Sequence, residues 1–222
     1  RRGRRETMRL PVAREQVLTT CLALANRGYL AATGGNVALR IDETQFLVTP
    51  SAVDYYAMTP SDLCVVRISD EQWVAGDRQP SVEAGLHAAV FRRRPDCAVS
   101  LHTHQPIASA YGLLSRPLEI ADADRRTLLG DAVPCVQYAP SGTTWLATQA
   151  SAAFGPAHHA CLMRNHGVLC VGRDCKTAIA RVVALEAECA LYFRARVSGT
   201  LPPLAAALVR DALVAELGES LR

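Results

Sequence analysis

Lysine is almost absent from this sequence. Its 24 basic residues include a single lysine, Lys176, within GRDCKTAIARVV, where it is predicted to begin a long helix near solvent. Schiff-base aldolases and pyridoxal enzymes need a lysine amine that is desolvated enough to act as a nucleophile. The composition therefore argues against both classes of enzyme.

Long apolar runs and closely paired cysteines are also missing. No stretch of about 18 consecutive apolar residues is present, and no apolar signal core follows the N-terminal arginines, so neither a membrane span nor a secretory signal is predicted. The eight cysteines form no C-x-x-C pair and mostly lie in apolar runs, as small hydrophobic residues do. We therefore expect free thiols and a cytoplasmic protein.

Charge of one sign is not in excess. The net charge is +3 over 222 residues, and the arginine clusters lack the interleaved aromatic residues on which single-stranded nucleic acids stack. We expect neither a nucleic-acid nor a membrane partner. Half of the residues are apolar, which suits a substantial core. We expect one domain over 1–222, with residues 1–10 disordered.

The order of the predicted elements indicates an α/β protein. Apolar residues at helical spacing predict a helix over about 11–27, and the runs NVALRI, QFLVTP, LCVVRI and QWVAG predict an antiparallel meander. Later helices are predicted over 80–95, 105–114, 141–154, 174–197 and 203–217, with strands over 97–104, 134–139 and on both sides of a turn at 165–167. Either Ser141 or Thr143 is expected to cap the helix over 141–154. These elements predict a central, mostly antiparallel sheet with helices packed on its faces.

Two of the six histidines, His102 and His104, stand one residue apart at the end of an apolar run. Residues two apart in a strand share a face, so the Thr103 side chain would point to the opposite face and both imidazoles could contact the same ligand. The alternative to a shared binding site is that the two histidines are simply a polar pair on the solvent-exposed face of an edge strand. A third histidine, His166, lies in a turn where Gly167 could take a positive φ and direct the preceding side chain outward. Three neutral imidazoles with an open fourth position are the usual catalytic zinc arrangement.

Glu83 and three further histidines need separate interpretation. Glu83 lies in the first turn of the helix that Ser81 is predicted to cap, where it could simply stabilise the helix dipole. A carboxylate beside a metal can also be a ligand or a general base. We expect His87, four residues on, to be a core residue or to support a ligand, and we expect His158 and His159 to be solvated loop residues.

The loops ATGGNVALR and VTPSAVDY are rich in backbone donors and hydroxyl groups. Gly34 and Gly35 would let N–H groups converge on an anion such as a phosphate. Each loop could equally be a plain turn. Neither has the spacing of a P-loop or of a dinucleotide-binding fingerprint.

The order and spacing of five segments resemble the class II aldolase/adducin family: TGGNVALR, LVTPSAVDYYAMTPSDLCVV, QPSVEAGLHAAVFRRRPD, LHTHQPIASA and NHGVLCVG. The resemblance covers about residues 15–200. It implies a three-layer α/β/α sandwich, commonly a C4 homotetramer with active sites between subunits. It further implies that His102, His104 and His166 are zinc ligands. Glu83 then corresponds to a metal ligand of the resting enzyme that handles the proton once substrate displaces it.

The resemblance also implies a phosphate site formed by Gly35, Asn36, Ser51 and Ser81. Aldolases of the family usually read S-G-N, T-G and S-S-E in these three places, whereas this chain reads GGN, SA and SVE, which removes two hydroxyl groups. A site with fewer donors would bind a phosphate dianion less tightly or hold a carboxylate instead.

The general acid and the reaction are less well defined by the sequence. The tyrosine of the aldolases has no match in EIADADRRTLLGD, and the nearby Asp122 and Asp124 are not assigned its role. The leading hypothesis is a zinc-dependent lyase that cleaves a C–C bond of a sugar phosphate through an enediolate, with Glu83 moving the proton. Decarboxylation of a keto or hydroxy acid and dehydration of a thioribulose-type substrate use the same electron sink.

Two other functions fit the sequence less well. Epimerases of the family carry aspartate where this chain has Glu83, which disfavours that activity. A non-catalytic, adducin-like interaction module would have no need to keep His102, His104, His166 and Glu83 together. The sequence therefore favours an enzyme.

Overall fold

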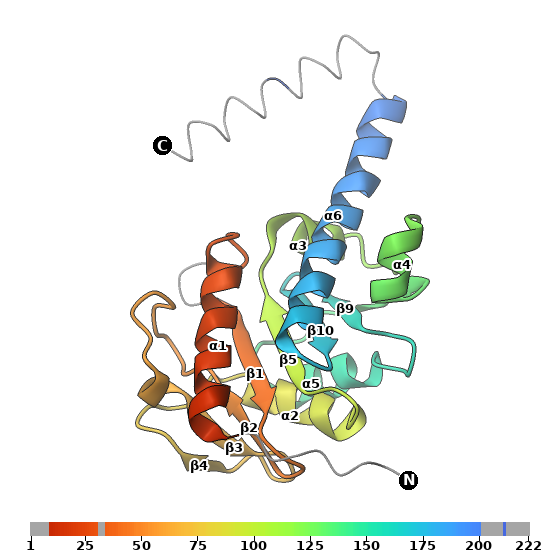
Figure 1. Ribbon diagram of the computed structural model, residues 1–222. Helices are drawn as coiled ribbons and strands as arrows, with labels where there is room; N and C mark the ends of the chain where they lie inside the picture. The colour runs from red at the N-terminus through yellow and green to blue at the C-terminus, as the bar shows by residue number, and fades with distance from the viewer. Residues whose placement is uncertain (1–8, 31–33, 201–210, 212–222) are drawn as a thin grey trace.

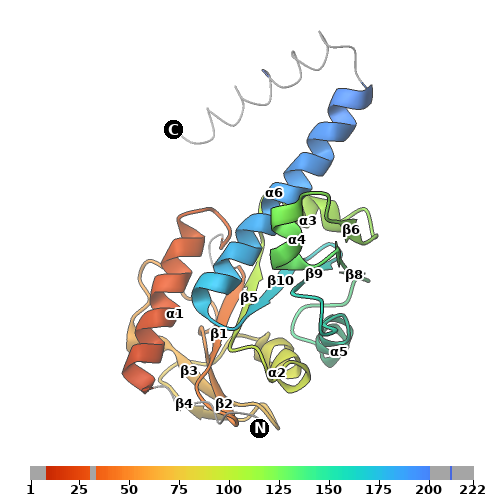
Figure 2. The ribbon, with the colours of Figure 1, turned by 45° about the vertical axis from the view of Figure 1, so that its right-hand side comes forward.

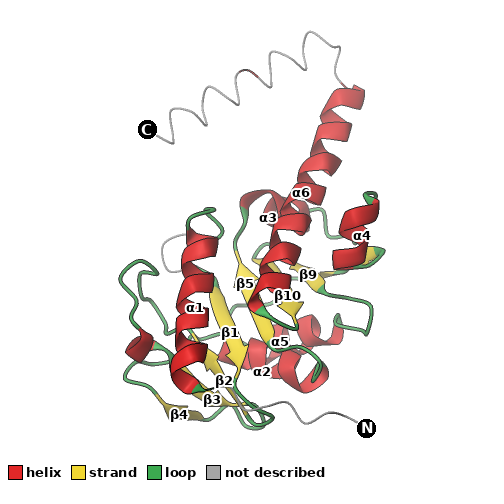
Figure 3. Ribbon diagram, in the orientation of Figure 1, coloured by secondary structure: helices red, strands yellow, loops and turns green. Residues whose placement is uncertain are grey.

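The computed structural model describes residues 9–30, 34–200 and 211. Its centre is an eight-stranded sheet in the order β4-β3-β2-β1-β5-β10-β9-β8 (Figures 1 and 3). Neighbouring strands are antiparallel except for β8 and β9, which are parallel. The expected α/β class and mostly antiparallel sheet are confirmed. The strands of this sheet are β1 (Asn36–Arg40), β2 (Gln45–Val48), β3 (Cys64–Arg67), β4 (Trp73–Ala75), β5 (Val99–Thr103), β8 (Cys135–Val136), β9 (Ala160–Met163) and β10 (Gly167–Gly172).

Helices cover both faces of the sheet and complete three layers (Figure 2). One face carries α1 (Leu10–Ala25), α3 (Pro106–Gly112), α4 (Ala123–Leu129) and α6 (Cys175–Thr200), and the other carries α2 (Ala84–Arg93) and α5 (Thr144–Ala152). A short 3-10 helix, η1 (Pro60–Asp62), and a two-stranded ribbon of β6 (Leu118–Glu119) and β7 (Ala132–Val133) complete the described elements.

The alternation of side chains along β5 places polar groups on one face of the sheet. Val99 and Leu101 pack in the cluster that joins the sheet to α1 and α6, so Ser100 and His102 face α2. Both polar residues are fully buried because β5 lies in the middle of the sheet, between β1 and β10. The edge-strand interpretation of the H-x-H pair is therefore wrong.

Two details of the predicted turns and caps are also wrong. Ser81 is not the N-cap of α2, because the helix begins at Ala84 with Glu83 at the N-cap. In the turn before β10 the positive φ belongs to Asn165, at 53°, and not to Gly167. Helix α5 is capped by Thr143, one of the two residues proposed for that role.

Other predictions concern the thiols and the ends of the chain. All eight cysteines are free, as expected. Lys176 is exposed in the first turn of α6. Helix α1 begins at Leu10; residues 1–8, which make up most of the segment expected to be disordered, and nearly all of the predicted helix 203–217 lie outside the described residues. Among the helices that the structure describes, none is long and apolar enough to cross a membrane.

Candidate functional site

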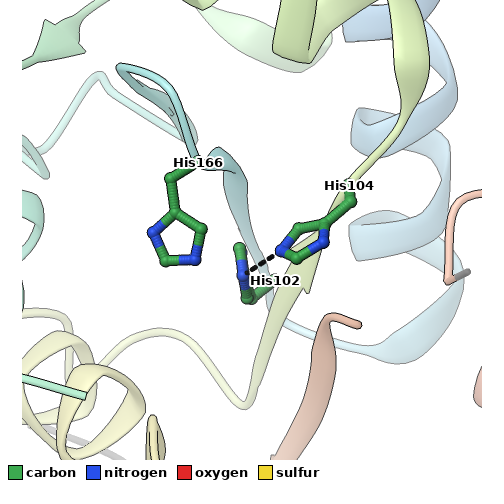
Figure 4. Close-up of side chains that lie close together, drawn as sticks. All are labelled: His102, His104 and His166. Carbon is green, nitrogen blue, oxygen red and sulfur yellow. Dashed lines mark hydrogen bonds between the residues drawn. The ribbon is translucent and has the colours of Figure 1, made fainter. Parts of the chain in front are cut away.

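Three histidines from two neighbouring strand ends meet at one point. His102 is the fourth residue of β5, His104 follows the end of that strand, and His166 lies in the turn before β10 (Figure 4). One ring nitrogen of each lies within 4.8 Å of the others, and the Nε2 atoms of His102 and His104 are 2.9 Å apart. The structure thus brings together the three residues that the sequence singled out.

The protonation of His102 leaves a lone pair directed at this point. Its Nδ1 lies 2.9 Å from Val168 O and must donate there, so Nε2 is unprotonated in the neutral ring. Burial lowers the pKa of His102 to about 4, and burial also lowers the pKa of His104. Neutral imidazoles oriented through their second nitrogen are the form in which histidine binds metals.

Two glycines allow the surrounding backbone to approach the histidines closely. A Cβ on Gly167 would lie 2.5 Å from Thr103 O, 2.8 Å from His104 Cδ2 and 3.1 Å from His102 Cε1. A Cβ on Gly35, whose φ is +78°, would lie 2.7 Å from His102 O. The absence of a side chain at both positions is therefore a steric requirement of the site.

Glu83 extends from the N-terminus of α2 into the histidine cluster. Its Oε2 lies 3.3 Å from His102 Nε2, and its Oε1 lies 3.1 Å from His166 Nε2. The residue is only 5% exposed. The side chain does not cap its own helix, so the dipole role considered for it does not describe its contacts. The Glu83 carboxylate thus contacts the imidazoles of His102 and His166.

Four polar neighbours keep this carboxylate ionised. Burial by itself would raise the pKa of Glu83, but a hydrogen bond from His166, the proximity of His102 and a hydrogen bond from Asn36 together lower it well below its usual range. Asn36 Nδ2 donates to Oε2 at 2.7 Å, and Ser141 Oγ donates to Oε1 at 2.8 Å. Glu83 is therefore a proton acceptor at neutral pH.

The set of atoms around the cluster fits a divalent cation. The lone pair of His102 Nε2 faces both His104 Nε2 and an anionic Glu83 oxygen, an arrangement of electron-rich atoms that a cation stabilises. His102, His104 and His166 would hold the ion, and Glu83 could supply a further ligand.

The segment that follows His104 is held by hydrogen bonds to α6, made by residues that the sequence did not indicate. Gln105 is fully buried, accepts a hydrogen bond from Thr103 Oγ1 at 2.8 Å and donates to Val182 O of α6 at 3.0 Å. Two and three residues further on, the N–H groups of Ile107 and Ala108 donate to the buried Glu186 of α6, at 2.9 and 2.8 Å. His104 lies beyond the regular strand, so these bonds to α6 set its position.

The four residues assigned to phosphate binding lie at differing distances from this centre. Asn36 pairs with His102 in the sheet register and touches Glu83, while Ser81 Oγ accepts the N–H of Glu83 at 3.3 Å. Gly35 precedes Asn36. Ser51 joins the Ser81 loop through its N–H bond to Gln79 O at 3.0 Å, beside the Pro50 and Pro80 bridge.

The remaining polar residues considered from the sequence lie elsewhere. Asp122 caps α4 by accepting the N–H of Arg125, and Asp124 lies in the first turn of that helix. His158 and His159 are half-buried rather than solvated, and Arg94, at the C-cap of α2, donates to the carbonyl of His158. Burial lowers the pKa of His159 to about 4.

Ser141 is the contact to Glu83 that sequence reasoning missed. It was considered only as a possible cap for α5, a role that Thr143 takes. Its hydrogen bond to Glu83 connects residues 58 positions apart. The segment YAPSGT does contain a turn-forming Ser-Gly pair, but nothing in that pattern indicates which distant group the hydroxyl contacts.

Comparison with known proteins supports the same interpretation. The profile of the class II aldolase and adducin N-terminal domain matches residues 15–193. The chain belongs to this family. It is accordingly an enzyme of the lyase type, and class II aldolases use a divalent metal ion, which agrees with the histidine cluster.

Relatives of this family member include two kinds of lyase. A 5-methylthioribulose-1-phosphate/5-deoxyribulose-1-phosphate aldolase of Rhodospirillum rubrum is 32% identical over 73% of this chain and 72% of its own length. A methylthioribulose-1-phosphate dehydratase of Klebsiella pneumoniae is 32% identical over 81% of this chain and 95% of its own length. Among solved structures, an L-fuculose 1-phosphate aldolase is 26% identical with a TM-score of 0.80, covering 94% of this chain and 99% of that one.

Proposed function

We propose that this class II aldolase family member is a zinc-dependent aldolase that cleaves a C–C bond of a small ketose 1-phosphate. The observation that carries the proposal is the contact of an ionised, buried carboxylate, Glu83, with two of the three metal-binding histidines, at 3.3 and 3.1 Å. A proton acceptor beside a metal site is what enolisation of a hydroxyketone requires.

Zinc bound by His102, His104 and His166 would act as a Lewis acid that polarises the substrate carbonyl. In the cleavage, the electron pair of the broken C–C bond stays on the carbon next to that carbonyl, giving an enediolate, while the hydroxyl on the departing carbon passes its proton to the Glu83 carboxylate and becomes the aldehyde carbonyl. Glu83 then gives this proton to the enediolate carbon. In the reverse direction the same carboxylate removes that proton.

Support for a 1-phosphate substrate comes from the relatives and from one side of the site. The Rhodospirillum rubrum and Klebsiella pneumoniae relatives are both named for ribulose 1-phosphate compounds. We assign the phosphate to Gly35, Asn36, Ser51 and Ser81. Asn36 and Ser81 both hydrogen-bond Glu83, and the antiparallel bridge between Pro50 and Pro80 joins the segments of Ser51 and Ser81. The Gly35 N–H, the Asn36 amide and the two serine hydroxyl groups are donors of the kind that a phosphate needs.

Dehydration is the second candidate, and a specific observation favours it. The Klebsiella pneumoniae relative that is covered over 95% of its length is named as a dehydratase. Dehydration also begins with removal of a proton beside the carbonyl, after which hydroxide leaves from the next carbon. Glu83 would serve both reactions as the base.

The proton transfer is tested by proton NMR of dihydroxyacetone phosphate in deuterated water. Zinc-loaded protein should exchange one carbon-bound proton of this compound, and Glu83→Gln should abolish the exchange while zinc content stays the same. Absence of exchange from a fully zinc-loaded protein would contradict aldolase chemistry on dihydroxyacetone phosphate.

Products distinguish the two candidates. With 5-deoxyribulose 1-phosphate or methylthioribulose 1-phosphate as substrate, an aldolase releases dihydroxyacetone phosphate and an aldehyde. A dehydratase instead releases water and keeps all the carbon atoms in one product. Mass spectrometry of the product separates these outcomes directly.

We also propose a homotetramer, the assembly that the family resemblance implies. Light scattering coupled to size-exclusion chromatography tests it. An elution mass of about four chains is expected, and a monomer that is fully active would contradict the proposal.

A further inference from the structure

A chain of buried polar side chains leads away from Glu83 on the side opposite Ser141. Asn36 Nδ2 donates to Glu83 Oε2 at 2.7 Å, Asn36 Oδ1 lies 2.6 Å from His87 Nε2, and His87 Nδ1 lies 2.7 Å from Ser100 Oγ. His87 and Ser100 are fully buried, and Asn36 is 3% exposed. The chain therefore crosses from β5 to α2 and on to β1 without meeting solvent.

The direction of each hydrogen bond follows from the chemistry of the groups. An ionised carboxylate only accepts hydrogen bonds, so the Asn36 NH2 group must face Glu83 and the amide oxygen must face His87. His87 therefore carries its proton on Nε2. Its Nδ1 then has a lone pair and accepts the hydroxyl proton of Ser100. All three contacts are satisfied in this one arrangement.

The opposite orientation of the Asn36 amide would have a different consequence for the site. Rotation of the amide by 180° would place its oxygen against Glu83 Oε2 at hydrogen-bond distance, so that two acceptors would face each other. The His87 N–H would likewise face an NH2 group. The His87 donor therefore reinforces the orientation that the Glu83 carboxylate requires, in which Asn36 directs an NH2 group into the site. One of these two hydrogens binds Glu83, and the second remains for a substrate oxygen.

We propose that His87 is a positioning residue for the reaction, acting through the orientation of the Asn36 amide. This inference deepens the proposed function and rests on it. His87 is neutral because burial lowers its pKa to about 3. It contacts none of the three metal-binding histidines by a hydrogen bond, so its removal should spare metal binding and impair proton transfer.

The variants His87→Gln and His87→Leu test this role. Glutamine places an N–H group near the position of the imidazole Nε2, whereas leucine has no donor. Outer hydrogen-bond partners of metal sites typically change activity by about 10- to 100-fold, so His87→Leu should lower kcat of the zinc-loaded enzyme by about that factor. His87→Gln should recover most of the loss. Zinc content should stay unchanged in both variants.

Ser100→Ala is the matched control. It removes a buried hydroxyl from the far end of the same chain but leaves the donor to Asn36 in place, so kcat should change by less than about threefold. If His87→Leu lowers thermal stability or zinc content while kcat per bound zinc is unchanged, His87 has only a structural role and the inference is wrong. Equal losses in His87→Gln and His87→Leu would also overturn it.

A measurement without substrate separates this inference from the proposed function. In zinc-loaded protein labelled with 15N at histidine, the His87 signals should show the tautomer with the proton on Nε2. A proton on Nδ1 would overturn the inference even if the variants do not fold. If the tautomer is as expected but no ketose phosphate reacts, the proposed function fails while the orientation of Asn36 stands.

Discussion

Ser141 donates a hydrogen bond to Glu83, with 2.8 Å between Oγ and Oε1. The serine precedes α5 and the glutamate precedes α2, so the bond joins the N-terminal ends of two helices that pack side by side (Figure 2). It opposes the bond from Asn36, which binds the other oxygen. Both carboxylate oxygens thus accept a hydrogen bond, and His102 and His166 lie 3.3 and 3.1 Å from them.

Loss of the Ser141 hydroxyl should weaken proton transfer more than stability. A hydrogen bond to a charged group contributes about 1.5–3 kcal/mol, so Ser141→Ala should slow proton exchange by roughly tenfold or more. Thr143→Ala is the control, because Thr143 caps α5 and does not touch Glu83. That variant should lose about 1 kcal/mol of unfolding free energy and keep its exchange rate. The reverse pattern would show that Ser141 is structural.

Substitution of His102 tests the proposed metal centre. The Nε2 of His102 lies 2.9 Å from that of His104 and the residue is fully buried, so His102→Ala removes a ligand that solvent cannot replace easily. Elemental analysis should show about one zinc ion per chain in the unaltered protein and almost none in the variant. His159→Ala, which removes a half-buried histidine elsewhere, should keep the metal. Unchanged zinc content in His102→Ala would exclude the proposed centre.

Gly167→Ala should damage the site although it adds only one carbon atom. The new Cβ would lie within 3.1 Å of Thr103 O, His104 Cδ2 and His102 Cε1, and an overpacked position typically costs about 1–3 kcal/mol. We expect reduced zinc affinity in a competition titration together with a lower Tm.

Gly85→Ala provides the comparison for Gly167. Its Cβ would meet the Glu71 carboxylate at 2.7 Å, which is the flexible end of a side chain. Gly85 lies within α2, where alanine is favoured over glycine by about 0.5–1 kcal/mol. This variant should be as stable as the unaltered protein or more stable, with normal zinc affinity. Similar effects of the two substitutions would contradict the steric explanation.

The acid stability of the loop around residue 96 should depend on one ion pair. Hydrogen bonds from Arg94 hold the pKa of Asp96 at about 2, below its ordinary value. A lowered folded pKa stabilises the protein above the unfolded pKa, and this stabilisation disappears as the pH falls through the folded value. Asp96 is 64% exposed, so the effect is limited to about 0.5–1 kcal/mol.

Denaturation of Asp96→Asn at several pH values measures this contribution. The variant should be less stable than the unaltered protein at pH 7, and the difference should vanish between about pH 4 and pH 2. Arg94→Ala should cost more at pH 7, because Arg94 also binds the carbonyls of Gly155 and His158. A difference for Asp96→Asn that is independent of pH would exclude the ion pair as its cause.

The sequence alone determined the local elements and indicated the members of the histidine cluster. The meander β1 to β4 follows from short apolar runs between turn residues, and the H-x-H pair at the end of β5 follows from the two-residue period of a strand. The resemblance supplied the order in which Glu83 and His166 join that pair. These properties depend on neighbours along the chain or on a spacing that can be counted.

Only the tertiary structure decided which groups surround Glu83. Ser141 lies 58 residues from it and Asn36 lies 47 residues from it, and both contacts depend on how α2 and α5 pack against the sheet. The same holds for Gly167, whose missing side chain is needed by Thr103 and the two histidines rather than by its own turn. The chain of hydrogen bonds from Ser100 through His87 to Asn36 also depends on the register that places β1 beside β5. Side-chain packing across layers has no period along a chain, so no pattern in this sequence could express it.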